Sequence, residues 1–100
     1  MPVAPAPPLP GTLQPRITLI DTQPGGKVVV TTSRDNQKMV HVQLTLDTEQ
    51  ILEKTLPNTR LEFQLPIDRV HGFTARAIYT DKDGNDLGQW SDVRSDSSQI

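Results

Sequence analysis

The sequence predicts an all-β protein, an antiparallel two-sheet sandwich of about seven strands, and two observations support that prediction. Several segments between Arg16 and Arg94 alternate apolar and polar residues with the two-residue period of a half-buried strand. Glycine, proline, asparagine and aspartate residues, which are typical of turns, separate these segments. In a chain of 100 residues, this pattern indicates two sheets packed around one core.

The first half of the chain supplies three expected strands. In "RITLID", Ile17 and Leu19 are expected on one face, and "QPGG" then predicts a turn. The β-branched run in "KVVVTTS" favours a strand by propensity. The segment "KMVHVQLTLD" alternates most regularly, with His41 on the face exposed to water. The inward residues expected for that strand are Val40, Val42, Leu44 and Leu46.

The second half continues the pattern. The segment from Ile51 to Leu56 is expected as a short edge strand or an irregular crossing, because it is too short for a stable helix. A last strand is expected from Gln89 to Arg94. The inward residues expected for "RLEFQLP" are Leu61, Phe63 and Leu65, and those for "FTARAIYT" are Phe73, Ala75, Ala77 and Tyr79.

Three regions are expected along the chain. Residues 1–14 are rich in proline, which favours extended polyproline II, so they are expected to form a flexible tether. Residues 15–95 are expected to form the sandwich, and residues 96–100 to form a frayed polar tail. An SH3-type ligand in the tether is a weaker alternative, because the run contains no basic residue.

Composition argues against several classes of function. Ten Lys and Arg against twelve Asp and Glu are scattered along the chain, with no basic stripe for a nucleic-acid backbone. Cysteine is absent, so disulfides, thiol catalysis and cysteine zinc sites are excluded. No window has the apolar length of a membrane span. The first basic residue is Arg16, so no signal peptide is expected at the start, and the localisation stays unknown.

The stretch "LEFQLPIDRVHGFTARAIYTDKDGNDLGQWSD" resembles the E-F-G region of a fibronectin type III domain, and the likeness covers roughly Pro15 to Ser95. The shared features are a Leu-Pro corner, an aromatic residue followed by alternating small and basic residues, a polar hairpin and a Gly-x-Trp-Ser stretch. The chain departs from the family at Phe73, where a corner tyrosine is usual, and in "KVVVTTS", which lacks the family's tryptophan.

The segment "DKDGND" resembles a calcium-binding loop. Asp81, Asp83 and Asn85 stand at alternate positions, and Asp92 falls where an EF-hand closes. Asp86 occupies the sixth position, however, where that loop needs glycine for its sharp turn. Asp-Gly between two strands predicts a hairpin instead. We therefore expect no metal, with weak surface calcium binding as the alternative.

Trp90 is the only tryptophan and the main candidate for an interaction surface. A sugar platform or an interface anchor would each use an exposed ring. The family resemblance implies a third role, because "WSDVRS" is similar to the Trp-Ser motif of cytokine-receptor type III domains. There, arginines stack on the ring, and Arg76 is the matching outward residue. The candidate surface comprises Trp90, Arg76, Arg94 and Tyr79.

No catalytic residue and no cofactor site emerges from the sequence. His41 and His71 lack metal-ligand spacing and are expected to be satisfied surface residues. The serines lack an elbow motif. We therefore expect a non-enzymatic module that binds or spaces other proteins, an accessory part of a larger assembly such as a phage virion or tail or a bacterial surface protein. A carbohydrate-binding module of a secreted polysaccharide-degrading system is the alternative, with carbohydrate as a possible partner.

Overall fold

The structure is a computed structural model that describes residues 13–35 and 38–100. The described residues form strands and turns without a helix, so none of them belongs to a helix that could cross a membrane. In chain order the strands are β1 (Ile17–Gln23), β2 (Lys27–Thr32), β3 (Met39–Leu46), β4 (Ile51–Leu56), β5 (Arg60–Gln64), β6 (Gly72–Thr80), β7 (Asp86–Leu87) and β8 (Arg94–Ser97).

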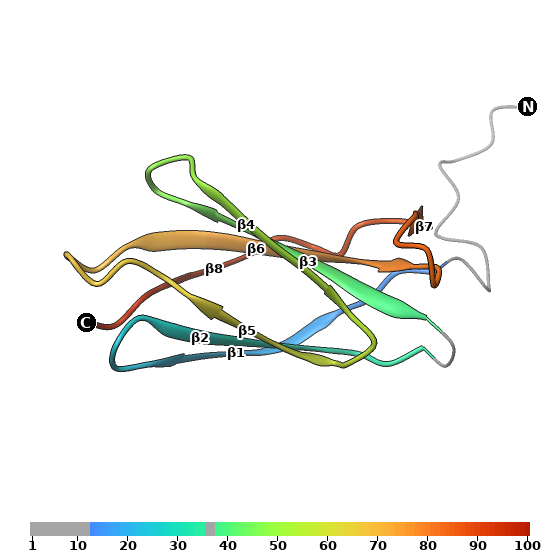
Figure 1. Cartoon of the computed structure of the whole chain (residues 1–100), viewed down its shortest axis with the longest axis horizontal. Helices are drawn as coiled ribbons and strands as arrows, with labels where there is room; N and C mark the ends of the chain where they lie inside the picture. The colour runs from blue at the N-terminus through green and yellow to red at the C-terminus, as the bar shows by residue number, and fades with distance from the viewer. Residues whose placement is uncertain (1–12, 36–37) are drawn as a thin grey trace, which may run out of the picture.

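The strands form two antiparallel sheets, which confirms the predicted all-β class. One sheet has the order β1-β2-β5, and the other has the order β4-β3-β6 with β7 and β8 both paired to the far side of β6. Figure 1 shows the two sheets as separate layers. The described residues contain eight strands, against about seven expected, because the edge beside β6 is split into β7 and β8.

The core lies between the sheets and is built from alternate residues of the central strands. The inward faces predicted for β3, β5 and β6 are confirmed, because every residue expected there is buried in one cluster. Ala77 is fully buried, and its small side chain lies among larger aliphatic neighbours. Burial of these apolar side chains is the main favourable term in the stability of such a domain.

Strand β1 departs from the predicted alternation. Ile17 is buried, but Leu19 is 56% exposed, and Ile20 packs against the core in its place. The cause is a register shift against β2 between Ile17 and Leu19, the kind of irregularity that a β-bulge produces. One extra residue in a strand reverses the facing of every residue beyond it.

The predicted last strand, Gln89 to Arg94, is wrong. Those residues mostly form an irregular segment between β7 and β8, and the strand begins at Arg94. The predicted frayed tail is also wrong in part, because Asp96 and Ser97 belong to β8. Beyond the strand, Gln99 accepts a hydrogen bond from the Gly26 amide through its backbone carbonyl.

The predicted tether covers residues 1–14. Of these, residues 1–12 lie outside the described part of the chain. Its last two residues belong to the sandwich instead. Leu13 packs partly against the core, and its carbonyl accepts a hydrogen bond from the Gln89 amide. The side-chain amide of Gln14 donates to the Trp90 carbonyl. The sandwich therefore includes Leu13 and Gln14, which the sequence placed in the tether.

The connections alternate between two ends of the molecule. The β2–β3, β4–β5 and β6–β7 connections meet at one end, which we call the β4–β5 end. The β1–β2, β3–β4 and β5–β6 connections meet at the other end, the β5–β6 end, together with the C-terminus (Figure 1). Loops grouped at the end of a rigid sandwich are a common place for binding sites.

Candidate functional site

Trp90 lies in the irregular segment between β7 and β8. Gly88 begins this segment with a φ of 79°, a conformation that side-chain-bearing residues rarely adopt. The chain rejoins β6 at Ser91, whose amide donates to the Ala77 carbonyl and whose hydroxyl accepts from the Ala77 amide. The serine hydroxyl thus takes the place of a backbone carbonyl as the acceptor for the Ala77 amide. The Trp90 side chain lies against β6 at Arg76.

The structure brings Trp90 and Arg76 together. The Cζ atom of Arg76 lies 3.9 Å from the centroid of the Trp90 ring, a distance that suits a cation–π contact. Arg76 alternates with the inward residues of β6, so its side chain lies on the outer face of the five-stranded sheet. Its Nε donates to Oε1 of Gln43 on the neighbouring strand β3, which fixes the guanidinium beneath the indole.

Three further side chains close a ring of contacts with this pair. Gln43 donates its side-chain amide to Glu53 Oε1, and His41 Nε2 lies 2.9 Å from the same oxygen. The His41 ring lies 5.3 Å from the Trp90 ring, centroid to centroid. The Gln43 amide, and then His41, hold the pKa of Glu53 below its usual range. We call this group the Trp90 cluster: His41, Gln43, Glu53, Arg76 and Trp90.

The other two predicted surface residues lie elsewhere. Tyr79 is only 4% exposed, and its hydroxyl lies within hydrogen-bond distance of the Ser33 hydroxyl and donates to the Ser33 carbonyl. Arg94 pairs with the inward residue Ala75, so it shares the inner face, and it donates to the Ile17 carbonyl on β1. Neither residue belongs to the Trp90 cluster.

The segment 81–86 forms a hairpin between β6 and β7, as the Asp-Gly pair predicted. One carboxylate oxygen of Asp81 accepts from the amides of Asp83 and Asn85, and the other accepts from the Asn85 side chain. These bonds, that to the Asn85 amide above all, lower the pKa of Asp81. Within residues 13–35 and 38–100, no group of three His, Cys, Asp or Glu side chains could hold a metal ion.

The expectation of a surface histidine is wrong for His71, which is 2% exposed. Its Nδ1 lies 2.8 Å from Asp47 and its Nε2 lies 2.7 Å from Asp68, and Arg69 lies 2.7 Å from Asp47. An imidazole that donates from both nitrogens carries a positive charge. Asp68, and then Asp47, therefore raise the pKa of His71. Ser98 adds two hydrogen bonds to the His71 backbone.

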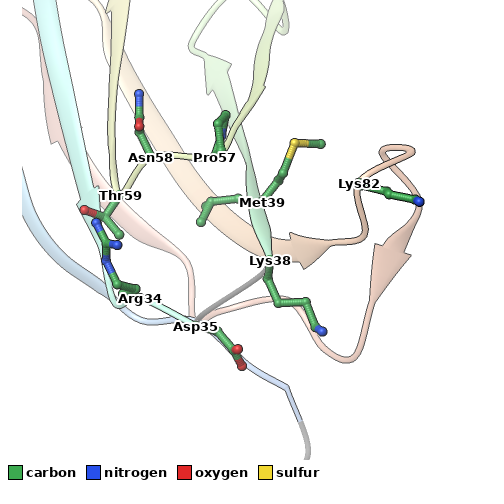
Figure 2. Close-up of a pocket in the computed structure, with 9 residues that line it drawn as sticks. Arg34, Asp35, Lys38, Met39, Pro57, Asn58, Thr59 and Lys82 are labelled. Carbon is green, nitrogen blue, oxygen red and sulfur yellow. The ribbon is translucent and has the colours of Figure 1, made fainter.

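A pocket of about 350 Å³ opens at the β4–β5 end. It forms where strand β4 leaves β3, since Val40 and Leu56 are the last paired residues and Pro57 has no amide hydrogen to continue the ladder. Figure 2 shows residues from three connections around it. The lining residues are Arg34, Asp35, Lys38, Met39, Val40, Pro57, Asn58, Thr59 and Lys82.

The pocket lining combines apolar residues with mainly basic ones. Met39, Val40 and Pro57 provide the apolar part. The charged lining residues are three cations, Arg34, Lys38 and Lys82, and one carboxylate, Asp35. This site was not predicted from the sequence, because Lys82 on the β6–β7 connection lies far along the chain from Arg34 and Lys38 on the β2–β3 connection. The only sequence signal was the basic residues beside the turn segments "RDNQ" and "DKDG".

Comparison with protein-family models gives no match for this chain, and comparison with curated proteins gives none either.

Proposed function

We propose that this chain is a non-enzymatic module that binds another protein of a larger assembly, and that its fold is fibronectin type III-like. The strand order supports the fold assignment. In constant-type immunoglobulin domains the fourth strand belongs to the same sheet as the first, second and fifth strands. Here β4 pairs with β3 in the second sheet, and the first sheet keeps three strands. The Trp90–Arg76 contact adds to the likeness with the Trp-Ser motif.

The pocket at the β4–β5 end carries the functional proposal. Its lining offers cations, an amide and an apolar surface, which are groups that recognise a polypeptide. It lies at the tip of the sandwich, where a partner could approach without disturbing either sheet. By analogy with such sandwiches, the assembly is a phage virion or tail or a bacterial cell surface.

The same geometry gives less support to a carbohydrate-binding module. Sugar platforms use exposed aromatic rings, and Tyr79 is buried in the core. Trp90 is partly buried, and Arg76 covers one face of its ring. A glycan would have to displace the arginine before it could stack there.

Site-specific photo-crosslinking in the native source tests the proposal. A photo-reactive amino acid in place of Asn58, which is exposed at the pocket, should crosslink to one defined protein. The same group in place of Val70, which is 50% exposed at the β5–β6 end, is the matched control. Crosslinks from Val70 alone, or retention of the chain on polysaccharide without any protein crosslink, would contradict the proposal.

A further inference from the structure

We propose that the pocket at the β4–β5 end binds an acidic, extended segment of the partner protein, with carboxylates on both sides of one apolar side chain. This inference rests on the proposed function and names the chemistry of the partner. It follows from two features of the pocket, its excess of positive charge and the position of its apolar lining.

The pocket lining has an excess of positive charge, with three cations against one carboxylate. Within the described part of the chain, no carboxylate lies within ion-pair distance of Arg34, Lys38 or Lys82. Elsewhere in the described residues, Lys27 is paired with Glu62 and Arg69 with Asp47. The whole chain has a formal charge of -2, so the local excess of cations comes from the fold and not from composition. A negatively charged ligand would complement it.

The arrangement of the lining sets the shape of the ligand. Figure 2 shows Arg34 on the left of the pocket and Lys82 on the right, with Lys38 and Met39 between them. The cations are therefore spread along the opening, and the apolar surface of Met39 and Pro57 lies within their span. A pocket of about 350 Å³ holds a few side chains and not a folded surface. An extended segment matches this layout.

A nucleic acid would share the negative charge but fits less well. Phosphate backbones are bound by many cations in a row, and affinity rises with their number. This pocket offers three cations and one opposing carboxylate, Asp35. The aromatic side chains that would stack on bases are absent from its lining. An acidic polypeptide therefore accounts for the lining better than a nucleic acid does.

Titration of the full, isotope-labelled chain with a synthetic probe tests the inference. The probe is a peptide of glutamates flanking one leucine, and two control peptides replace the glutamates by glutamine or the leucine by glycine. We expect saturable amide shifts at Lys38, Asn58 and Lys82, with dissociation constants up to about 1 mM. Both control peptides should bind more weakly. Added salt should lower the affinity for the acidic probe, because exposed charges are screened.

Matched charge variants locate the site. Lys82→Gln should lower the affinity for the probe about two- to five-fold, which is the effect of losing one exposed ion pair. Lys27→Gln makes the same change of charge at the opposite end of β2, beside Glu62, and should leave binding unchanged. Equal effects of the two variants, or shifts confined to the Trp90 cluster, would overturn the assignment.

Two other outcomes separate this inference from the proposed function. A single-stranded oligonucleotide that binds more tightly than the acidic peptide would overturn the inference in favour of a nucleic acid. A partner protein crosslinked from Asn58, together with no saturable binding of the acidic probe, would also overturn it. In that last case the proposed protein-binding function would stand.

Discussion

The guanidinium of Arg76 lies against the indole of Trp90, with 3.9 Å between Arg76 Cζ and the ring centroid. The two residues come from different segments, β6 and the irregular chain before β8. Gln43 orients the guanidinium because its Oε1 accepts a hydrogen bond from Arg76 Nε. The contact therefore joins the last irregular segment to the middle of the five-stranded sheet.

Removing the indole should destabilise the fold. We expect Trp90→Ala to lower the free energy of unfolding by about 1–3 kcal/mol, because apolar contact area and the cation–π contact are both lost. Arg76→Ala should cost less, and the double variant should lose less than the sum of the two. Chemical denaturation of the three variants measures these differences.

The control for this prediction is Arg76→Lys, which keeps the charge but loses the planar stacking group. It should retain only part of the coupling with Trp90. If Trp90→Ala left stability unchanged but abolished binding to a partner or glycan, Trp90 would be a recognition residue and not a structural one.

Stability should depend on pH through His71. Its pKa in the folded state is raised above the ordinary value of 6.5 by Asp68 and Asp47. The stabilisation from the charged imidazole is therefore fully present below pH 6.5 and is lost as pH rises through the folded-state pKa. The pKa values of Asp47 and Asp68 are lowered from 3.8, so their stabilisation is lost as pH falls below that value. Denaturation measured from below pH 3.8 up to about pH 9 should show stability falling on both sides.

Two variants separate the charge of His71 from its packing. His71→Gln should remove the alkaline fall in stability, because glutamine does not titrate. Ser98→Ala removes a hydrogen bond to the His71 amide without changing any titratable group, so it should lower the whole curve and keep its shape. An unchanged alkaline slope in His71→Gln would show that another group causes it.

Docking of Leu13 should make Gly88 intolerant of substitution. Gly88 and Gly84 both have positive φ, 79° and 84°. Alanine at either position would therefore add backbone strain of about 1–2 kcal/mol. At Gly88 the added Cβ would also meet the Leu13 carbonyl oxygen, whereas open space surrounds that of Gly84. Gly88→Ala should therefore lower the melting temperature more than Gly84→Ala.

The same contact predicts a difference between two truncations. Removing residues 1–14 should lower the melting temperature relative to removing residues 1–12, because Leu13 packs on the core and its carbonyl binds the Gln89 amide. Equal melting temperatures of the two truncated chains would mean that residues 13–14 contribute nothing to stability.

Calcium should not stabilise the 81–86 hairpin. The Asp81 carboxylate already accepts hydrogen bonds from Asp83 and Asn85, so calcium would have to replace them. We expect calcium at about 5 mM to leave the melting temperature unchanged, since the loop lacks the EF-hand glycine. Asp81→Ala should lower the melting temperature with or without calcium. Saturable micromolar binding with slow exchange at Asp83 and Asp92 would contradict this prediction.

The sequence by itself determined which residues of β3, β5 and β6 form the core. The alternation in β3, β5 and β6 places apolar side chains on one face, and that face is buried in the structure. The outward position of Arg76 follows from the same two-residue period, because Ala75 and Ala77 on either side point inward. Local periodicity suffices for these features, since it fixes which face of a strand each residue occupies.

The tertiary structure decided the features that depend on contacts between distant segments. The break between β7 and β8 accommodates Leu13, which lies more than seventy residues earlier. His71 is buried because carboxylates from two different connections, Asp47 and Asp68, approach its ring. The pocket exists because β4 leaves β3 at Pro57, and its lining comes from three connections, two of which supply the cations. No local sequence pattern predicts such contacts, because they depend on how the two sheets pack and not on the period of any one strand.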